Sequence, residues 1–139
     1  WPTDEYRVFG GGIMSALGLK PWRDIDLIVS EDLYEWIKKE YKHDYWYSEE
    51  THLPIHFDSV PIELGPFPHS LEHNFPHLYN LDTFWDEYVM IENIPFILMR
   101  NTLMYKLHRK NSKFVQVEEK DKSDVDLITE YVKTNSFGF

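Results

Sequence analysis

Apolar and polar residues in the first third of the chain follow the periods of strands and helices. Tyr6–Phe9 is a short strand candidate that runs into three consecutive glycines. Gly12 to Leu19 has the pattern of a helix of about two turns that ends near Gly18. Residues 25–29 then form a compact apolar, mostly β-branched run. This order predicts a strand, a short helix and a second, buried strand.

The next segment, 30–42, has the features of an amphipathic helix. Ser30 is a favourable N-cap, acidic residues follow in the first turn, and lysines gather near the far end, where cations suit the helix dipole. The apolar side chains recur at helical spacing, so we expect them to face the core. They are Leu33, Trp36, Ile37 and Tyr41.

Two β-hairpins are predicted further along the chain. The first joins Leu53–Phe57 to Val60–Leu64 through Asp58–Ser59, and the second joins Tyr88–Ile91 to Ile94–Leu98. The first hairpin contains prolines, which cannot donate a hydrogen bond to a neighbouring strand. We therefore expect its strands at a sheet edge or at a bulge.

The remaining segments predict short elements and a helical C-terminal part. Residues 44–47 are a short aromatic strand candidate. Helices are expected at 81–88 with Asp82 as cap, at 103–110 and at 121–132, with an acidic exposed loop at 111–119. Together these elements predict an α+β (α/β) fold, a small mixed β-sheet packed with helices.

Length and composition agree with a folded domain. The chain has 139 residues, of which 42% are hydrophobic and 17% aromatic. This length favours a single domain, 1–139, with its core at 6–98 and a C-terminal helical part at 100–133. No apolar stretch approaches the ~20 residues of a membrane span, and the N-terminus has no signal-peptide pattern. We expect a soluble cytoplasmic protein with no membrane partner.

Charge and cysteine content narrow the chemistry further. A net charge of -10 argues against a broad non-specific grip on nucleic acid, because that affinity comes largely from Lys and Arg at phosphates. A local basic patch remains compatible with this charge. The chain has no cysteine, so disulfides and thiolate metal sites are excluded.

Two carboxylates stand at the head of the second strand. Residues two apart in a strand point to the same face, so Asp24 and Asp26 project side by side while Ile25 enters the core. Like charges this close resist joint ionisation unless a cation lies between them. A hard divalent ion, Mg²⁺ or Mn²⁺, held by carboxylate oxygens and completed by water and phosphates, meets this need.

The glycine run just upstream has the features of a phosphate site. Gly11 and Gly12 allow a tight turn and a close approach to a ligand, and the following helix would direct unpaired N–H groups at an anion. Gly10–Gly11 fits the same pattern, so the register is open. Arg23, just before the acidic pair, is either a phosphate contact or a loop cation that offsets nearby carboxylates.

A third carboxylate, Glu63, lies inside an otherwise apolar strand. Its neighbours are Ile62 and Leu64, and a carboxylate in such a place is costly unless it is paired or bound to a metal. Asp58 is the competing acidic position in this hairpin. It is disfavoured because it falls in the predicted turn.

Three histidines form a second candidate metal site. His69, His73 and His77 are spaced four apart, which on a helix would align them as ligands. Pro68 and Pro76 make a continuous helix improbable, and no further motif completes a tetrahedral set. Loop histidines without a metal are the preferred interpretation.

The Gly-Gly turn and Asp24-Ile25-Asp26, separated by about a dozen residues, resemble the nucleotidyltransferase signature of the polymerase β-like superfamily. A second resemblance lies in the C-terminal third, where a strand pair and a helix carrying Lys106 precede a Lys-Asp-x-x-Asp segment, Lys120 to Asp124. That order is similar to the tail of minimal and abortive-infection-type nucleotidyltransferases. The resemblance implies a nucleotidyltransferase (polymerase β-like) fold.

The resemblance also implies roles for individual residues. Asp24, Asp26 and Glu63 would be the catalytic metal ligands, although a Glu stands where the family often has Asp. Gly11, Gly12 and Ser15 would cradle the triphosphate, together with Arg23. Lys106 matches a family lysine near the nucleotide phosphates, with a solvated helix lysine as the alternative. Lys120, Asp121 and Asp124 are expected to brace helix packing.

The activity implied is that of a Mg²⁺-dependent (or Mn²⁺-dependent) nucleotidyltransferase. It would transfer a nucleoside monophosphate from a nucleoside triphosphate such as ATP to a hydroxyl acceptor: an RNA end, a protein or a small molecule. A toxin-like enzyme with an antitoxin-like partner is compatible with the family. Two alternatives stay open, a non-catalytic nucleotide-binding or regulatory module and an acidic interaction protein without ligand. The intact acidic set favours catalysis.

Overall fold

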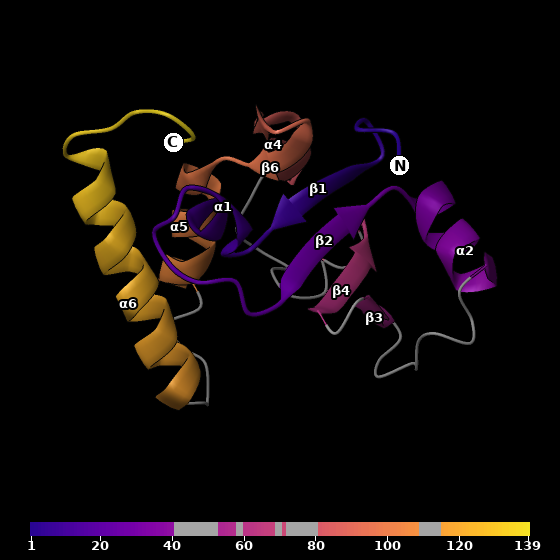
Figure 1. The fold of residues 1–139 in the computed structure, drawn as a ribbon, viewed down its shortest axis with the longest axis horizontal. Helices are drawn as coiled ribbons and strands as arrows, with labels where there is room; N and C mark the ends of the chain where they lie inside the picture. Colours follow the sequence, from indigo (N-terminus) through magenta and orange to yellow (C-terminus); the bar gives the residue numbers. More distant parts are fainter. Residues whose placement is uncertain (41–52, 58–59, 69–70, 72–80, 109–114) are drawn as a thin grey trace.

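In the computed structural model, the described residues are 1–40, 53–57, 60–68, 71, 81–108 and 115–139. They form a six-stranded mixed sheet with helices on both faces, which confirms the predicted α+β class (Figure 1). The strands are β1 (Tyr6–Phe9), β2 (Ile25–Val29), β3 (Leu53–Phe57), β4 (Val60–Pro66), β5 (Tyr88–Ile91) and β6 (Ile94–Ile97). The helices are α1 (Gly12–Ala16), α2 (Glu31–Glu40), α4 (Asp82–Asp86), α5 (Met99–His108) and α6 (Val115–Val132).

The topology places β2 in the interior of the sheet. The strand order is β3-β4-β2-β1-β6-β5, with β1 antiparallel and β4 parallel to β2. Asp26 is consequently paired with Phe9 on one side and with Glu63 on the other. Acidic positions that lie far apart in the sequence are thus neighbours in the sheet. Figure 1 shows α5 and α6 at one end of this sheet and α2 at the other.

Each face of the sheet carries a hydrophobic core. The first joins the strands to α1, α2 and α6, through Val8, Leu27, Val29, Leu64, Phe96, Ile13, Met14, Leu33, Ile37 and Ile128. The second, smaller core joins β2 and β6 to α4, through Ile28, Ile97, Leu71 and Phe84. Since side chains alternate along a strand, Asp26 shares the face of Ile28 rather than that of Leu27. The acidic positions therefore lie on the face of the second core.

Two local predictions are confirmed by hydrogen bonds and backbone angles. The Leu33 N–H donates to Ser30 Oγ at 3.1 Å, so Ser30 caps α2. Glu92 and Asn93 have φ values of 50° and 64°, the positive values of a type I′ turn, and they join β5 to β6. Both features depend only on residues close together in the sequence.

The helix bounds differ from those predicted. α1 stops at Ala16 rather than Leu19, because Gly18 takes a φ of +76° and the next N–H turns back to a carbonyl of the last turn. The loop expected at 111–119 is helical from Val115 onward. That stretch contains no Gly or Pro, and charged residues alone do not end a helix. α5 also begins earlier than predicted, at Met99.

Two predictions about helix side chains are wrong. Trp36 is 46% exposed, because α2 turns Leu33, Tyr34 and Ile37 toward the core instead. Asp82 is the first residue of α4 rather than its cap, and no side chain that the structure describes caps this helix. A carboxylate in the first turn still suits the helix dipole.

The proline prediction is right for one strand and wrong for the other. β3 lies at the edge of the sheet, as expected, but β4 lies between β3 and β2. Its prolines, Pro61 and Pro66, stand near its two ends, where a missing N–H does least harm. Among the helices that the structure describes, none has the length and apolarity to cross a membrane. The predictions at 44–47, Tyr41, Asp58, His69, His73 and His77 fall outside the described residues.

A buried cation joins β1 to the segment around α4 and β5. Arg7 is 4% exposed; its Nε donates to the Trp85 carbonyl at 2.8 Å, and Nη1 donates to the Thr3 and Tyr6 carbonyls at 2.7 Å. The guanidinium carbon lies 4.7 Å from the Trp85 ring centroid and 4.0 Å from that of Tyr88. One side chain thus supplies three hydrogen bonds and two aromatic contacts.

We expect Arg7→Met to lower the free energy of unfolding by about 2–4 kcal/mol, because it removes charge-assisted hydrogen bonds and leaves carbonyl groups without a donor. Urea unfolding followed by tryptophan fluorescence measures this loss. Arg100→Met is the matched control, since Arg100 pairs with Glu87 at the surface and should contribute less than about 1 kcal/mol. Equal losses in the two variants would contradict the role given to Arg7.

Candidate functional site

The acidic residues predicted from the sequence gather where β2 begins. Asp24 is exposed and immediately precedes β2, whereas Asp26 is half-buried within the strand. Glu63 is exposed and occupies the paired position of β4. Both Asp24 and Glu63 are near enough to act electrostatically on Asp26. The structure therefore places Asp24 and Glu63 within electrostatic range of Asp26.

The pKa of Asp26 is raised, mainly by burial. Burial raises the pKa of the Asp26 carboxyl, and the carboxylates of Asp24 and Glu63 raise it further. Lys120 and Lys106 act in the opposite direction, yet the pKa still reaches about 6, from an ordinary value of 3.8. Such shifts are typical of functional sites, where a charge is kept for its chemistry rather than for stability.

The glycine turn between β1 and α1 lies directly against Asp26. Gly10 has a φ of +63°, and a Cβ atom there would approach Asp26 Oδ2 to 2.9 Å. From α5, the fully buried Thr102 hydroxyl donates to the Gly10 carbonyl at 3.0 Å. Gly12 has no room for a side chain, since a Cβ would meet Val8 Cγ1 at 2.3 Å. The turn is therefore held in place, with its backbone close to the carboxylate.

Lys106 is buried in an ion-pair network between α5 and α6. Its side chain is 4% exposed, and its Nζ lies 2.7 Å from Asp124 Oδ2 and 3.2 Å from Asp121 Oδ1. Lys20, from the connection between α1 and β2, lies 3.0 Å from Asp124 Oδ2. Burial alone would raise the pKa of Asp124, but the two lysines outweigh it and lower that pKa. The solvated-lysine alternative for Lys106 is wrong, and Asp121 and Asp124 brace the helices as expected, whereas Lys120 is exposed and acts on Asp26 instead.

The other predicted residues lie around the turn without joining the acidic cluster. Ser15 Oγ donates to the Pro21 carbonyl at 3.3 Å, within the connection that leads from α1 to β2. Arg23 is exposed, one residue before Asp24. Gly11 immediately precedes α1, and its carbonyl accepts the first hydrogen bonds of that helix.

Sequence reasoning missed two residues of this region, Lys20 and Thr102. Lys20 stands in a loop and Thr102 at the expected start of a helix, so neither belongs to a periodic pattern or a motif. Their partners are remote: Lys20 and Asp124 are 104 positions apart, and Thr102 and Gly10 are 92 apart. The only signal in the sequence was that Lys20 is a cation in the loop that follows Gly18.

The donor set suits a hard divalent cation in its chemistry. Carboxylate oxygens are the preferred protein ligands of Mg²⁺, and a nearby positive charge would oppose the burial and the carboxylate repulsion that raise the pKa of Asp26. Within the described ranges, no three acidic or histidine side chains lie close enough together to hold a metal ion. The fit therefore rests on the type and charge of the donors.

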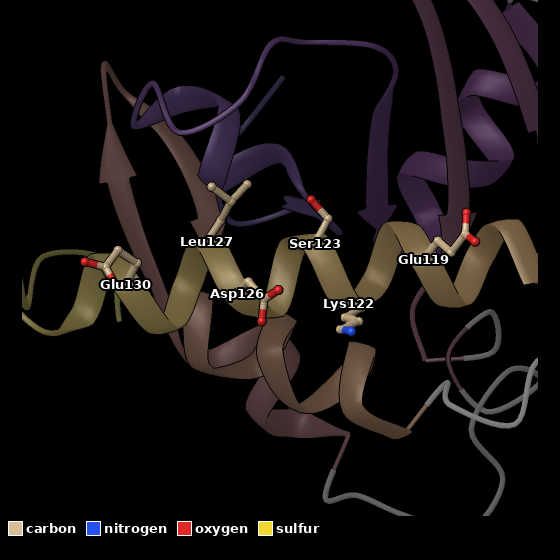
Figure 2. A pocket seen from close by; sticks show the side chains of 6 residues that line it. All are labelled: Glu119, Lys122, Ser123, Asp126, Leu127 and Glu130. Carbon is tan, nitrogen blue, oxygen red and sulfur yellow. The ribbon is translucent and has the colours of Figure 1, made fainter.

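A pocket of about 410 Å³ lies along α6, away from the predicted site residues. The described residues that line it are Glu119, Lys122, Ser123, Asp126, Leu127 and Glu130. Figure 2 shows Ser123 and Leu127 on one side of the helix, and Lys122 and Asp126 on the opposite side. None of these residues belongs to the acidic cluster or the glycine turn, so we do not assign the chemistry of the site to this pocket.

No family model matches the chain, and no curated protein sequence matches it either. The interpretation of the site therefore depends on its residues and their geometry.

Lys106→Met should lower the free energy of unfolding by about 3–5 kcal/mol, because Asp121 and Asp124 would lose their most buried cation. Lys133→Met is the control, since Lys133 pairs with Glu130 at the exposed end of α6 and should contribute less than about 1 kcal/mol. Chemical denaturation measures both. A loss as small as that of the control would mean that the network does not brace the helices.

The raised pKa of Asp26 predicts a pH-dependent stability. Between its ordinary value of 3.8 and about 6, the folded state holds this proton more tightly than the unfolded state does. Asp26 therefore makes stability fall as pH rises through this window, and the loss persists above it. We expect Asp26→Asn to raise the free energy of unfolding at pH 7.5 by about 1–2 kcal/mol and to flatten the pH profile. Denaturation from pH 4 to 8 tests this.

Asp126→Asn is the matched control for this pH profile, because Asp126 is exposed on α6. Its profile should follow that of the unchanged protein. A lower free energy of unfolding for Asp26→Asn at pH 7.5 would mean that the carboxylate stabilises the fold, which would contradict the destabilising role given to Asp26.

Proposed function

We propose that this chain is a metal-dependent nucleotidyltransferase, which transfers a nucleoside monophosphate from a nucleoside triphosphate to a hydroxyl acceptor. The observation that carries the proposal is the placement of Asp26. Its carboxylate lies against the backbone of Gly10 and is close to Asp24 and Glu63. An acidic cluster that suits a divalent cation thus adjoins a glycine turn that suits a phosphate chain, as this chemistry requires.

In this proposal Asp24, Asp26 and Glu63 supply the oxygen ligands for Mg²⁺ or Mn²⁺. An ion held there would supply positive charge at the phosphates and would make the acceptor hydroxyl more acidic. The support for the ligand set is the pairing of Asp26 with Glu63 across β2 and β4, and the electrostatic effect of Asp24 and Glu63 on Asp26. Their mutual repulsion keeps the site favourable for a cation.

The glycine turn receives the phosphate chain. Gly11 and Gly12 are the turn positions assigned to the phosphates; the space beside Gly11 holds the Lys20 ammonium group, and Gly12 packs against Val8. Ser15 on α1 and the exposed Arg23, one residue before Asp24, are proposed to orient the nucleotide. Lys106 contributes positive charge from the interior, since it already acts on Asp26 across the site.

The reaction balances without a further reactant. The acceptor oxygen forms a bond to the α-phosphorus, the bond from that phosphorus to the bridging oxygen breaks, and pyrophosphate leaves. The hydroxyl proton passes to Glu63 or to one of the two aspartates. Positioning of the two reactants and neutralisation of charge provide most of the rate enhancement.

Transfer of label from each α-³²P-labelled nucleoside triphosphate into a mixed RNA and protein lysate tests this function, with Mg²⁺ or Mn²⁺ present. We expect label in one fraction, which identifies the base and the class of acceptor together. Asp24→Asn/Asp26→Asn should abolish transfer, because it removes two carboxylate ligands. Asp32→Asn/Asp126→Asn, which makes the same charge change at exposed positions of α2 and α6, should retain it.

The same experiment separates the rival function. Triphosphate binding in the absence of any transfer, in the unchanged protein and the double variant alike, would favour a nucleotide-binding module without catalysis. Absence of both binding and transfer would overturn the proposal.

A further inference from the structure

The ammonium group of Lys20 lies over the glycine turn. A Cβ atom on Gly11 would approach Lys20 Nζ to 2.4 Å and Cε to 2.8 Å, well inside the contact distance of real Cβ atoms. Glycine at position 11 therefore leaves the space that the end of this lysine occupies. The cation is close to the backbone that the proposed function assigns to the phosphate chain.

Asp124 holds Lys20 in this position. Lys20 Nζ donates to Asp124 Oδ1 at 3.1 Å and to Oδ2 at 3.0 Å. An ammonium group has three N–H donors, so one donor is left for another acceptor while both of these bonds persist. Asp124 Oδ2 also forms an ion pair with Lys106 Nζ at 2.7 Å. Asp124 therefore remains paired with a cation when Lys20 turns partly toward a ligand.

Exposure distinguishes the two lysines of the network. The Lys20 side chain is 20% exposed, whereas that of Lys106 is 4% exposed and is enclosed by Asp121 and Asp124. A solvent-borne anion at the turn can meet Lys20 without breaking the buried ion pairs. To reach Lys106, the anion would have to break the buried ion pairs with Asp121 and Asp124.

The turn also needs a cation for electrostatic reasons. α1 has only five residues, so little of the attraction for an anion can come from its dipole. The nearby carboxylates of Asp24, Asp26 and Glu63 repel a polyphosphate. The ammonium group that Lys20 holds against Gly11 offsets that repulsion.

We propose that Lys20 is a binding residue for the polyphosphate chain of the substrate, held over the glycine turn by Asp124. The inference rests on the proposed function and adds to it the residue that meets the phosphates beyond the α-phosphate. In the bound state, Lys20 bridges Asp124 and a phosphate oxygen. Binding thereby couples the nucleotide to the α5–α6 network.

The probe that tests this is inorganic tripolyphosphate with Mg²⁺, which carries no base, titrated calorimetrically into the intact chain. Lys20→Met should weaken binding roughly 10- to 100-fold, the loss of one charge-assisted hydrogen bond to phosphate. Lys20→Arg, which retains the charge, should recover most of the affinity. Lys38→Met, the same change on α2, should leave it unaltered.

Two further readouts separate binding from a merely structural role. Thermal unfolding of each variant shows whether the loss of the Lys20–Asp124 pair unfolds the chain, and Lys20→Arg keeps the comparison valid if Lys20→Met is unstable. In the transfer reaction, Lys20→Met should raise KM for the triphosphate more than it lowers kcat.

The outcomes distinguish the inference from the function on which it rests. If the unchanged protein binds tripolyphosphate and transfers label, and Lys20→Met binds as tightly, the role of Lys20 is overturned and the function stands. If the unchanged protein binds neither tripolyphosphate nor any nucleoside triphosphate, both are overturned.

Discussion

The arrangement of the candidate site depends on one buried network of charges, formed by Lys20, Lys106, Asp121 and Asp124. Removal of such groups from water is strongly unfavourable, and only good mutual pairing makes their burial tolerable. Because the partners come from α5, α6 and the connection between α1 and β2, pairing is complete only when these segments meet in one register. The network thus specifies how the C-terminal helices lie against the glycine turn and where the Lys20 ammonium group sits.

The acidic cluster beside this network behaves in the opposite way. Burial and the carboxylates of Asp24 and Glu63 outweigh the two lysines that act on Asp26, and its pKa remains raised to about 6. Its immediate neighbours in β2, Ile25 and Leu27, pack on the first core, so the carboxylate adds nothing to that packing. Residues that disfavour the folded state in this manner are more common at functional sites than in structural ion pairs. The paired lysines and aspartates therefore stabilise the fold. The carboxylates around Asp26 are proposed to bind an external cation.

Much of the fold could be predicted because neighbouring residues decide it. Ser30 caps α2, Glu92 and Asn93 form the turn between β5 and β6, and strand alternation turns Asp26 to the face opposite Ile25 and Leu27. The exposure of Trp36 and the start of α6 at Val115 could not be predicted in the same way. Helical spacing is compatible with several buried faces, and the packing partner selects among them.

The sequence by itself determined the order of the elements, the glycine turn and the acidic pair, since each is encoded in a few adjacent residues. Tertiary structure decided which charge meets which. Lys20 and Asp124 are 104 positions apart, and Thr102 and Gly10 are 92 apart, so no local spacing relates them. Ion pairs and hydrogen bonds depend on distances of a few ångströms. Those distances exist only after the helices have packed on the sheet.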